Sequence, residues 1–407
     1  MLPRVRVERS TRGRAVAPGN PRVRGGRPGF CRLFRRVRKG DTADAADLWH
    51  HAKPGPRLRR HIPRVHIAAD YAARSQVPRD HAAALERSAP GRARGAGGER
   101  GRSGTLTDAV RVVAHAKVNL FLRILAREAP TGFHQIETAF ALLELADELV
   151  VTRTARDVAL TVHGPDLGPS EENLAVRAAR AVLEATGQKF GVALELTKRI
   201  PVRAGLGGGS SDAAAALHAV NLLAGNAVPS HELLYFATRL GADVAFFASG
   251  APCAVAWGRG ERLFRFAPPP AMPALIAMPS PPVGVATPDA YRWWDEMHPD
   301  PHSRGPVVLD AEVFAAWGSI GRLGGNDFEI PVFGKHPPLR ALFERLAGTH
   351  PYWVRLCGSG SAVAAVYGDK RRRDDAAMTL GEKRQGLIKT RTLASPPAAP
   401  APVEVLP

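Results

Sequence analysis

The chain has 407 residues, which is enough for two or three domains of roughly 150 residues each, and it carries a formal net charge of +18. Three cysteines without paired spacing argue for a reducing compartment and against a disulfide scaffold or a structural zinc site. No apolar run reaches the ~18 residues of a membrane span, and no signal-peptide core stands at the start, so a cytoplasmic location is predicted.

The positive charge is concentrated in the leading segment. Residues 1–104 hold 25 basic and 8 acidic side chains, so the rest of the chain is nearly neutral. The segment is rich in Arg, Gly, Pro and Ala and has no sustained hydrophobic period. We therefore expect residues 1–105 to be a disordered basic extension, with a short helix around residues 41–51.

Three alternatives apply to this extension. A basic arm could bind nucleic acid, but aromatic stacking pairs and zinc-ligand spacing are missing, so this interpretation is disfavoured. An organelle transit peptide is also Arg-rich and poor in acids, although Ser is sparse here. The preferred interpretation is a start site placed too far upstream, with the true start at a Val or Leu codon such as that of Leu106 or Val110.

The first predicted strand, residues 110–125, carries polar side chains inside an apolar run. By strict alternation Lys117, Asn119 and Phe121 share one face. The opposite face then carries Val118, Leu120 and Leu122. If that face is covered, Lys117 and Asn119 need hydrogen-bonding or charged partners. If it is not covered, they are simply part of a solvent-exposed strand face.

A turn and a helix follow. Residues 131–134, Thr-Gly-Phe-His, are predicted to form a turn before a strand at residues 136–150. Residues 172–186 then have the period of an amphipathic helix that ends at Gly187. Asn173 at its start either caps the helix or contacts a ligand.

The most informative stretch is residues 201–217, where glycines run into an alanine-rich helix. Gly205 and Gly207–Gly209 allow close approach to the main chain, and residues 210–212, Ser-Ser-Asp, offer helix-capping oxygens. Free N–H groups at such a helix start bind phosphate. No Lys follows the glycines, which excludes a Walker loop, and Ser210 weakens a dinucleotide fingerprint. A flexible linker is the alternative.

The next segment places a carboxylate at an element boundary. Residues 230–240 are predicted to form a helix that is capped by Ser230 and ends at Gly241, and residues 241–247 to form a turn and an apolar strand. Asp243 lies in that turn, where a carboxylate beside apolar residues is costly unless it is paired. It is otherwise an ordinary turn residue.

The remaining elements form a hairpin and a second domain. Residues 253–266 are predicted to be a β-hairpin, and a proline-rich joint at residues 268–273 leads to a strand at residues 274–278. Further predicted elements are a helix head at 325–329, a helix at 339–346, a glycine loop at 356–363 and an unstructured Pro/Ala tail at 395–407.

Several of these motifs, in this order, resemble the GHMP kinase superfamily of galactokinase, homoserine kinase, mevalonate kinase and phosphomevalonate kinase. Gly-Leu-Gly-Gly-Gly-Ser-Ser-Asp at 205–212, Ala-Lys-Val-Asn-Leu at 116–120 and Gly-Phe-His at 132–134 are most similar to the 4-diphosphocytidyl-2-C-methyl-D-erythritol kinase family. The resemblance covers about residues 110–368.

The resemblance implies a two-domain α+β fold. An N-terminal mixed α/β domain that binds ATP would occupy residues 106–270, and a ferredoxin-like C-terminal α/β domain residues 271–390, followed by a disordered tail at 391–407. The implied reaction is ATP-dependent phosphorylation of the 2-hydroxyl of 4-diphosphocytidyl-2-C-methyl-D-erythritol in the non-mevalonate isoprenoid pathway, with ATP and Mg²⁺ as cofactors. Another kinase of the superfamily, acting on homoserine or mevalonate, is the alternative.

The resemblance also assigns roles to residues. Asp243 would take or orient the hydroxyl proton, and Lys117 would lie beside it. Substrate contacts would come from Asn119, Phe133, His134 and Tyr291, with Trp293 and Trp294 competing with Tyr291 as the second aromatic of a cytosine clamp. The ATP-binding residues would be Pro201, Val202, Arg203, Ala204, Gly205, Leu206, Gly207, Gly208, Gly209, Ser210 and Ser211.

Two positions depart from the family pattern, and no metal ligand is assigned. Phe133 stands where Tyr is usual, which keeps the stacking face and loses the hydroxyl. Ala245 stands where Pro is usual, near Asp243.

Overall fold

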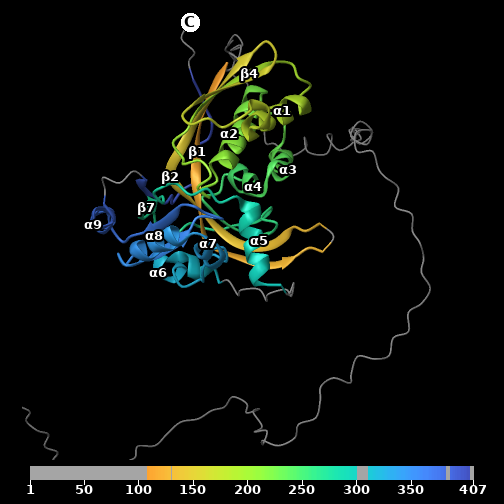
Figure 1. The fold of residues 1–407 in the computed structure, drawn as a ribbon. Helices are drawn as coiled ribbons and strands as arrows, with labels where there is room; N and C mark the ends of the chain where they lie inside the picture. The colour runs from red at the N-terminus through yellow and green to blue at the C-terminus, as the bar shows by residue number, and fades with distance from the viewer. Residues whose placement is uncertain (1–107, 130, 300–309, 382–385, 404–407) are drawn as a thin grey trace, which may run out of the picture. The chain divides into compact units, whose positions relative to one another are not determined.

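The computed structural model describes residues 108–129, 131–299, 310–381 and 386–403 (Figure 1). The predicted basic extension at residues 1–105, its short helix and the alternatives that concern it lie outside the described residues. Among the described residues, none of the helices has the length and apolar character needed to cross a membrane.

The first part of the described chain is built on a mixed sheet of seven strands in the order β11-β1-β2-β4-β3, with β5 paired to β2 and β6 to β5. Only β3 and β4 run parallel in this sheet among the described strands. The strands are β1 (Ala109–Arg127), β2 (His134–Thr154), β3 (Val158–His163), β4 (Gly191–Thr197), β5 (Cys253–Gly258), β6 (Arg262–Arg265) and β11 (Ala401–Pro402).

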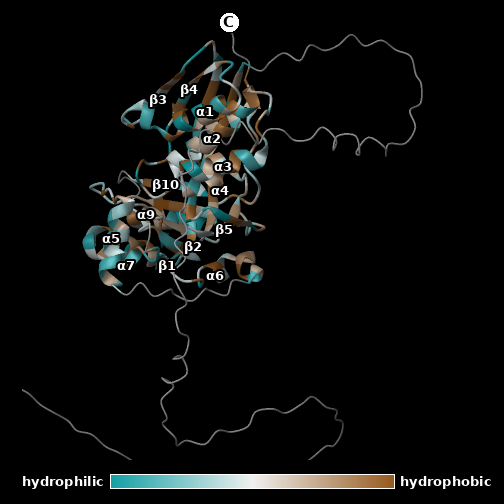
Figure 2. Ribbon diagram, turned by 90° about the vertical axis from the view of Figure 1, so that its right-hand side faces the viewer, coloured by the Kyte–Doolittle hydropathy of each residue, from teal (hydrophilic) through white to brown (hydrophobic). Residues whose placement is uncertain are grey.

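Helices α1 to α4 pack beside this sheet, with α2 at the centre of the helical layer (Figure 1). Their bounds are α1 (Leu174–Ala185), α2 (Gly208–Leu223), α3 (Ser230–Leu240) and α4 (Ala242–Ala248). Because α2 is alanine-rich, its small side chains let α1, α3, α4 and the sheet approach closely, and most of the helix is buried. It is pale brown in Figure 2, in contrast to the largely hydrophilic α5.

The second part is a four-stranded antiparallel sheet in the order β10-β7-β9-β8. Along the chain, several helices lie between β7 and β8 and a helix lies between β9 and β10, which is the β-α-β-β-α-β arrangement of a ferredoxin-like domain with additional helices in its first connection. The expected fold is therefore confirmed. The elements are β7 (Pro273–Ala277), α5 (Thr287–Met297), α6 (Trp317–Ile320), α7 (Glu329–Lys335), α8 (Pro337–Ala347), β8 (Trp353–Leu356), β9 (Val363–Val366), α9 (Lys370–Leu380) and β10 (Leu387–Arg391), with 3₁₀ turns at Ser170–Glu172 and Ala311–Ala315.

Strand β1 contributes to three hydrophobic clusters in succession. Val110 and Val112 pack with α1 and α2, Val118 and Leu120 pack where the two sheets meet, and Ile124 packs with elements of the second sheet. The core thus continues from one sheet into the other along a single strand. The expected domain division at residue 270 falls between β6 and β7.

The expected alternation in β1 is wrong at Phe121. The pairing of β1 with β2 shifts between Asn119 and Phe121, and a further shift precedes Lys117. Such a bulge adds one residue to one strand and exchanges its faces. Phe121 is therefore buried among the apolar residues of the junction, while Leu122 takes the face of Lys117 and Asn119.

Residues 242–248 form a helix, so the predicted turn and strand at 241–247 are wrong. A short apolar run cannot be assigned to strand or helix from its pattern alone. Here Val244 and Ala245 are buried against neighbouring helices, Phe246 packs on β2 and β5, and Gly241 precedes the helix immediately after α3. Asp243 consequently lies in a first helical turn.

Two predicted caps are also wrong, and one is confirmed. Helix α2 begins at Gly208 after Gly207, so Ser210, Ser211 and Asp212 lie inside it, and none of them caps it. Ser230 is the first residue of α3 and makes no capping bond, although the bounds of α3 are as predicted. Asn173 caps α1 by accepting a hydrogen bond from the N–H of Ala175 at 2.9 Å.

The tail is not wholly without regular structure. Ala401 and Pro402 pair with Arg111 and Val110 at the edge of the first sheet, and the N–H of Val403 donates to the carbonyl of Ala109. Composition did not predict this pairing because an edge strand needs only a few backbone hydrogen bonds and no apolar pattern.

Candidate active site

A cleft of about 1440 Å³ lies against the start of α2. It is lined by β1, the turn between β1 and β2, the start of α4, the turn between β5 and β6, α5 and the loop before β9. Lining residues from these elements include Lys117, Phe133, His134, Gly205, Ser210, Asp243, Arg259, Tyr291, Asp295 and Ser359.

The glycine loop reaches the cleft through bare backbone. Gly207 takes a left-handed conformation, with φ at 75°, and α2 follows without any side-chain cap. Within the part of the chain that the structure describes, no capping side chain accepts from the first-turn N–H groups of α2. A helix N-terminus in this state carries roughly half a unit of positive charge and suits an anion.

A second glycine loop holds the first in place. A Cβ on Gly205 would lie 1.8 Å from the carbonyl oxygen of Cys357, and φ at Gly205 is +78°. The N–H of Ala362 donates to the carbonyl of Ala204 at 3.1 Å. Residues 356–363 therefore pack beside the first glycine loop, and the contact requires glycine at position 205.

The eleven predicted ATP-binding residues fall into four groups. Gly205, Gly207 and Ser210 line the cleft. Ala204, Leu206 and Ser211 are buried and hold the loop on the core, while Val202, Arg203 and Gly209 are exposed. Pro201 and Gly208 are intermediate in exposure.

Lys117 and Asp243 meet next to this loop. The Nζ atom of Lys117 lies 3.3 Å from Oδ2 of Asp243, and the N–H of Lys117 donates to the carbonyl of Leu206 at 2.9 Å. The Lys117 side chain is 4% exposed and that of Asp243 is 34% exposed. The lysine is thus fixed by the core, while the carboxylate faces the open cleft.

Asn119 connects this pair to the second glycine loop. Its Oδ1 atom accepts from Nζ of Lys117 at 2.8 Å and from the N–H of Gly358 at 3.1 Å, and its Nδ2 atom donates to Thr138 at 3.0 Å. These three bonds use much of the hydrogen-bonding capacity of its side chain. Asn119 therefore positions Lys117 and the loop, in addition to lining the cleft.

His134 and Tyr291 lie together on the wall that is formed by β2 and α5. Their rings stack with centroids 4.3 Å apart and an angle of 13° between the planes. Nε2 of His134 lies 2.7 Å from Oδ1 of Asp295, whose other oxygen lies 3.4 Å from Arg127. Burial raises the pKa of the Tyr291 phenol above its usual range, and the negative charge of Asp243 adds to this effect.

The other candidate aromatics have different surroundings. Phe133 lines the same cleft and is 55% exposed. Trp293 lines a separate groove with α7 and α8, and Trp294 is buried and stacks on His298. Of Tyr291, Trp293 and Trp294, Tyr291 is the one that lines the cleft.

The comparisons with known proteins agree with this geometry. The family described as GHMP kinases N terminal domain matches residues 173–251. The 4-diphosphocytidyl-2-C-methyl-D-erythritol kinase of Solibacter usitatus is 39% identical over 276 residues, which are 66% of this chain and 84% of the relative. The enzyme of that name from Moorella thermoacetica is 35% identical over 70% of this chain and 100% of the relative. The chain belongs to the 4-diphosphocytidyl-2-C-methyl-D-erythritol kinase family.

Solved structures support the same assignment. A crystal structure of a 4-(cytidine 5'-diphospho)-2C-methyl-D-erythritol kinase superposes with a TM-score of 0.58 at 36% identity, covering 69% of this chain and 98% of the other. A homoserine kinase from Cytophaga hutchinsonii gives a TM-score of 0.54 at 18% identity, over 74% of this chain and 99% of the other. At that identity the second match shows the shared fold alone.

Sequence reasoning missed a buried charge cluster beneath the phosphate loop of this kinase. Nζ of Lys198 lies 2.7 Å from Oδ2 of Asp212 and also bonds Asp147, whose Oδ1 accepts from the N–H groups of Arg199 and Ile200. Oδ1 of Asp212 is buried and has no hydrogen-bond partner among the described residues. The cluster holds one more carboxylate than it has cations.

The excess of one carboxylate over the single cation affects the pKa values of the cluster. Burial raises the pKa of the Asp212 carboxyl to about 7; Lys198 opposes this rise and Asp147 adds to it. Burial alone would lower the pKa of the Lys198 ammonium, but the two carboxylates together raise it. In the sequence, the only indication of this cluster is the position of Asp147 near the end of a predicted strand. That position does not show which residues contact Asp147.

Four further cleft residues were missed. Thr287 and Ser359 lie with their hydroxyl oxygens 3.0 Å apart, and Arg259 and Asp295 line the same cleft. Ser359 lies in the predicted glycine loop at 356–363, which could have indicated it. Asp295 and Arg259 gave no such signal because a charged residue near the end of a helix or in a hairpin turn is usually solvent-facing.

Proposed function

We propose that this chain transfers the γ-phosphoryl group of ATP to the 2-hydroxyl of 4-diphosphocytidyl-2-C-methyl-D-erythritol. The observation that carries the proposal is the pair of Lys117 and Asp243, 3.3 Å apart, beside the start of α2 in a cleft whose other wall bears Phe133, His134 and Tyr291. A phosphate-binding end and an aromatic end in one cleft suit a substrate that carries a nucleobase and an alcohol.

The phosphate end acts by position and charge. Phosphoryl transfer asks the protein mainly for alignment and charge neutralisation. The first-turn N–H groups of α2 and the backbone of Gly205 and Gly207 would hold the phosphates of ATP. The contact of Gly205 with Cys357 keeps this backbone in place before any ligand arrives.

Asp243 and Lys117 would act on the alcohol. The 2-hydroxyl oxygen forms a bond to the γ-phosphorus, the bond from that phosphorus to the β,γ-bridging oxygen breaks, and ADP leaves. The hydroxyl proton passes to the carboxylate of Asp243, or is oriented by it. The charge of Lys117 would offset the negative charge on the transferred group, and its burial and its bond to Asn119 hold Nζ beside Asp243.

The aromatic end would bind cytosine. Phe133 and Tyr291 both line the cleft, and either ring offers a face for stacking. His134 is held by Asp295 through Nε2 and by Tyr291 through stacking, so its ring orientation is set in advance. We propose that its other ring nitrogen contacts the edge of the base.

Mg²⁺ fits this cleft as an ion held mainly by phosphate. Such an ion usually takes one or two protein ligands and keeps several waters. Among the described residues no group of three or more His, Cys, Asp or Glu side chains could hold a metal ion by itself. Ser210 and Asp243 line the cleft and would supply oxygens, whereas Asp212 is engaged by Lys198. When bound, Mg²⁺ would neutralise charge on the phosphates.

The test is a coupled assay of ADP release with the full chain, ATP and Mg²⁺. We expect ADP to form with 4-diphosphocytidyl-2-C-methyl-D-erythritol and only at background level with homoserine or mevalonate. Turnover of homoserine or mevalonate without turnover of the cytidine compound would overturn the proposal in favour of another kinase of the superfamily.

A further inference from the structure

Arg259 lies against one of the proposed base-binding rings. Arg259 lies in the turn between β5 and β6. Its guanidinium carbon is 4.1 Å from the centroid of the Phe133 ring. A guanidinium at this distance stacks on the ring face and is attracted by its quadrupole. Two segments more than a hundred residues apart in the sequence thus meet at the rim of the cleft.

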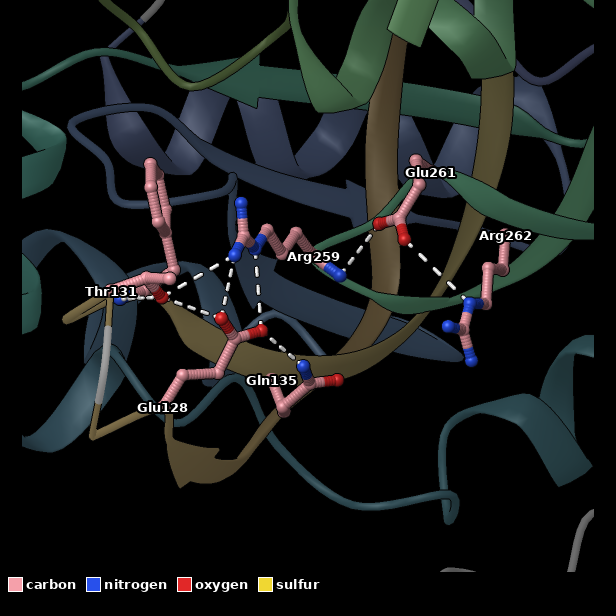
Figure 3. A network of polar contacts seen from close by, with 7 residues as sticks. Glu128, Thr131, Gln135, Arg259, Glu261 and Arg262 are labelled. Atoms are coloured by element: carbon pink, nitrogen blue, oxygen red, sulfur yellow. Dashed lines mark hydrogen bonds and ion pairs between the residues drawn. The ribbon is translucent and has the colours of Figure 1, made fainter. Parts of the chain in front are cut away.

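The guanidinium group of Arg259 is also held by the carboxylate of Glu128. Nη2 of Arg259 lies 2.6 Å from Oε2 of Glu128, and Nε lies 3.3 Å from Oε1. Gln135 and Thr131 also donate to Glu128, and Nη2 of Arg259 lies 3.3 Å from the Thr131 hydroxyl. Figure 3 shows Glu128 enclosed by Arg259, Thr131 and Gln135.

The charges of this pair persist over the whole range of ordinary pH. Hydrogen bonds from Arg259 and then from Thr131 lower the pKa of the Glu128 carboxyl to about 2. The bond to Glu128 in turn raises the pKa of the Arg259 guanidinium. A bidentate pair of this kind fixes the plane of the guanidinium as well as its position.

The backbone of the turn sets where the side chain begins. The N–H of Arg259 donates to Oε2 of Glu261 at 2.7 Å, and Gly258 takes a left-handed φ of 74°. Glu261 also lies 3.7 Å from Arg262, which points away from Arg259 in Figure 3. The turn therefore places Arg259 against the Phe133 ring and directs Arg262 away from Arg259.

Phe133 gains an ordered orientation from this contact. The ring is 55% exposed and would otherwise be a mobile side chain on a turn. With the guanidinium on one face, the opposite face is left for a ligand in the cleft. A ring that is already ordered loses less conformational freedom when a base stacks on it.

We infer that Arg259 is a positioning residue for cytosine recognition: it holds Phe133 between its own guanidinium and the base, with Glu128 as its anchor. The inference rests on the proposed function, because it requires that Phe133 stacks on the base. It gives a reason why Phe, without a hydroxyl to fix the ring, serves at this position in this chain.

The test compares Arg259→Ala with Arg262→Ala in the full chain. Arg262 lies in the same hairpin, is 67% exposed and does not line the cleft, so its variant is the matched control. Affinities for cytidine and for CDP are measured by calorimetry, and steady-state constants with the complete substrate. For Arg259→Ala we expect affinity to fall roughly two- to fivefold for both ligands. KM for the substrate should rise by a similar factor, kcat should change less than twofold, and Arg262→Ala should match the wild type.

A double-mutant cycle separates ring positioning from other roles of Arg259. In a Phe133→Leu background, Arg259→Ala should cause no further loss of cytidine affinity, since there is no ring to hold. Arg259→Lys, which keeps the charge but loses the fork toward Glu128, should lie between the wild type and Arg259→Ala.

Four outcomes would overturn the inference. Losses that add in the double variant would remove Phe133 as the intermediary. A loss for CDP without a loss for cytidine would assign Arg259 to the diphosphate instead. Wild-type behaviour of Arg259→Ala, in an enzyme that still turns over the cytidine substrate, would overturn this inference and leave the proposed function standing. A wild-type chain that binds no cytidine would overturn both.

Discussion

Asp243 and Lys117 show how single residues are placed at this site. The lysine is surrounded by core residues and bonded by Asn119, so its position is fixed before ligands bind. Asp243 lies in the first turn of α4 and remains partly open to the cleft. The pair therefore combines a buried, fixed ammonium group with a carboxylate that is accessible from the cleft.

We predict that Asp243→Asn lowers kcat by at least ~10²-fold, because the amide no longer accepts the hydroxyl proton while the geometry is kept. The affinity for ATP should change little, since we propose that the backbone of the glycine loop binds the phosphates. Steady-state kinetics and nucleotide titration test this, with Asp375→Asn on the exposed side of α9 as the control. Turnover at the wild-type rate would remove Asp243 from the mechanism.

Asp212 gives a prediction about stability and pH. Its carboxyl has a pKa of about 7 in the folded protein, above the ordinary value of 3.8. Between these values the folded state holds a proton that the unfolded state has lost, so this residue makes the free energy of unfolding fall as pH rises from about 4 to 7. The slope is about 1.4 kcal/mol per pH unit at most.

Replacement of this residue by Asn should remove that slope. Urea denaturation of the wild type and of Asp212→Asn at pH 5, 6, 7 and 8 should give a stability difference that shifts in favour of the variant up to pH 7 and then levels off. The absolute stability of the variant can be lower because Lys198 loses a partner, but the pH dependence of the difference is the readout. Parallel pH profiles would contradict the raised pKa.

At the scale of elements, two glycine loops hold each other. Gly205 touches the carbonyl of Cys357 so closely that no other residue fits, and Asn119 reaches from β1 to Gly358. The backbone proposed to bind phosphate is therefore shaped by a loop about 150 residues further along the chain.

We predict that Gly205→Ala lowers the free energy of unfolding by at least about 2 kcal/mol, because its Cβ would overlap a backbone carbonyl and its φ is left-handed. Gly209→Ala, in the first turn of α2, is the matched control, since a Cβ there has open space and the backbone is helical. Its stability should stay within about 1 kcal/mol of the wild type in urea denaturation. Equal losses in the two variants would contradict the role of the contact.

Elements with strong local signals were predicted well, and those that depend on neighbours were not. The helix at Ser230–Leu240 and the hairpin around residue 260 have clear start and stop residues, and both are confirmed. The helix with Asp243 was mistaken for a strand because its apolar run is short and its packing decides the outcome. The bulge that turns Phe121 inward left no mark in the pattern of apolar residues.

At the scale of the whole molecule, β1 joins the two sheets through one continuous core. Its residues belong in turn to three hydrophobic clusters, and Trp353 of β8 donates to the carbonyl of Leu120 at 2.9 Å. The hydrophobic core of the first sheet is therefore continuous with that of the second sheet.

We therefore predict a single cooperative unfolding transition for the described part of the chain. Far-UV circular dichroism, which reports both parts, and tryptophan fluorescence, to which the buried Trp317 and Trp353 beside the second sheet contribute, should give coincident midpoints in urea. Separate midpoints would show that the two parts unfold independently despite the shared strand.

The overall architecture and the phosphate loop could be predicted because several motifs with their own local chemistry occur in a fixed order. The cluster of Lys198, Asp147 and Asp212 could not, since its members are brought together by the pairing of β2 with β4 and by the packing of α2. Nor could the contact of Arg259 with Phe133, which depends on the relative placement of two turns.

The burial of Cys357 behind the phosphate loop has a consequence for chemical reactivity. Burial raises the pKa of its thiol to about 12, so almost no thiolate exists at neutral pH in the closed protein, and the same holds for Cys253. Alkylation of Cys357 must then wait until the two glycine loops part. Its rate in the native protein measures how often that happens, and bound nucleotide should slow it.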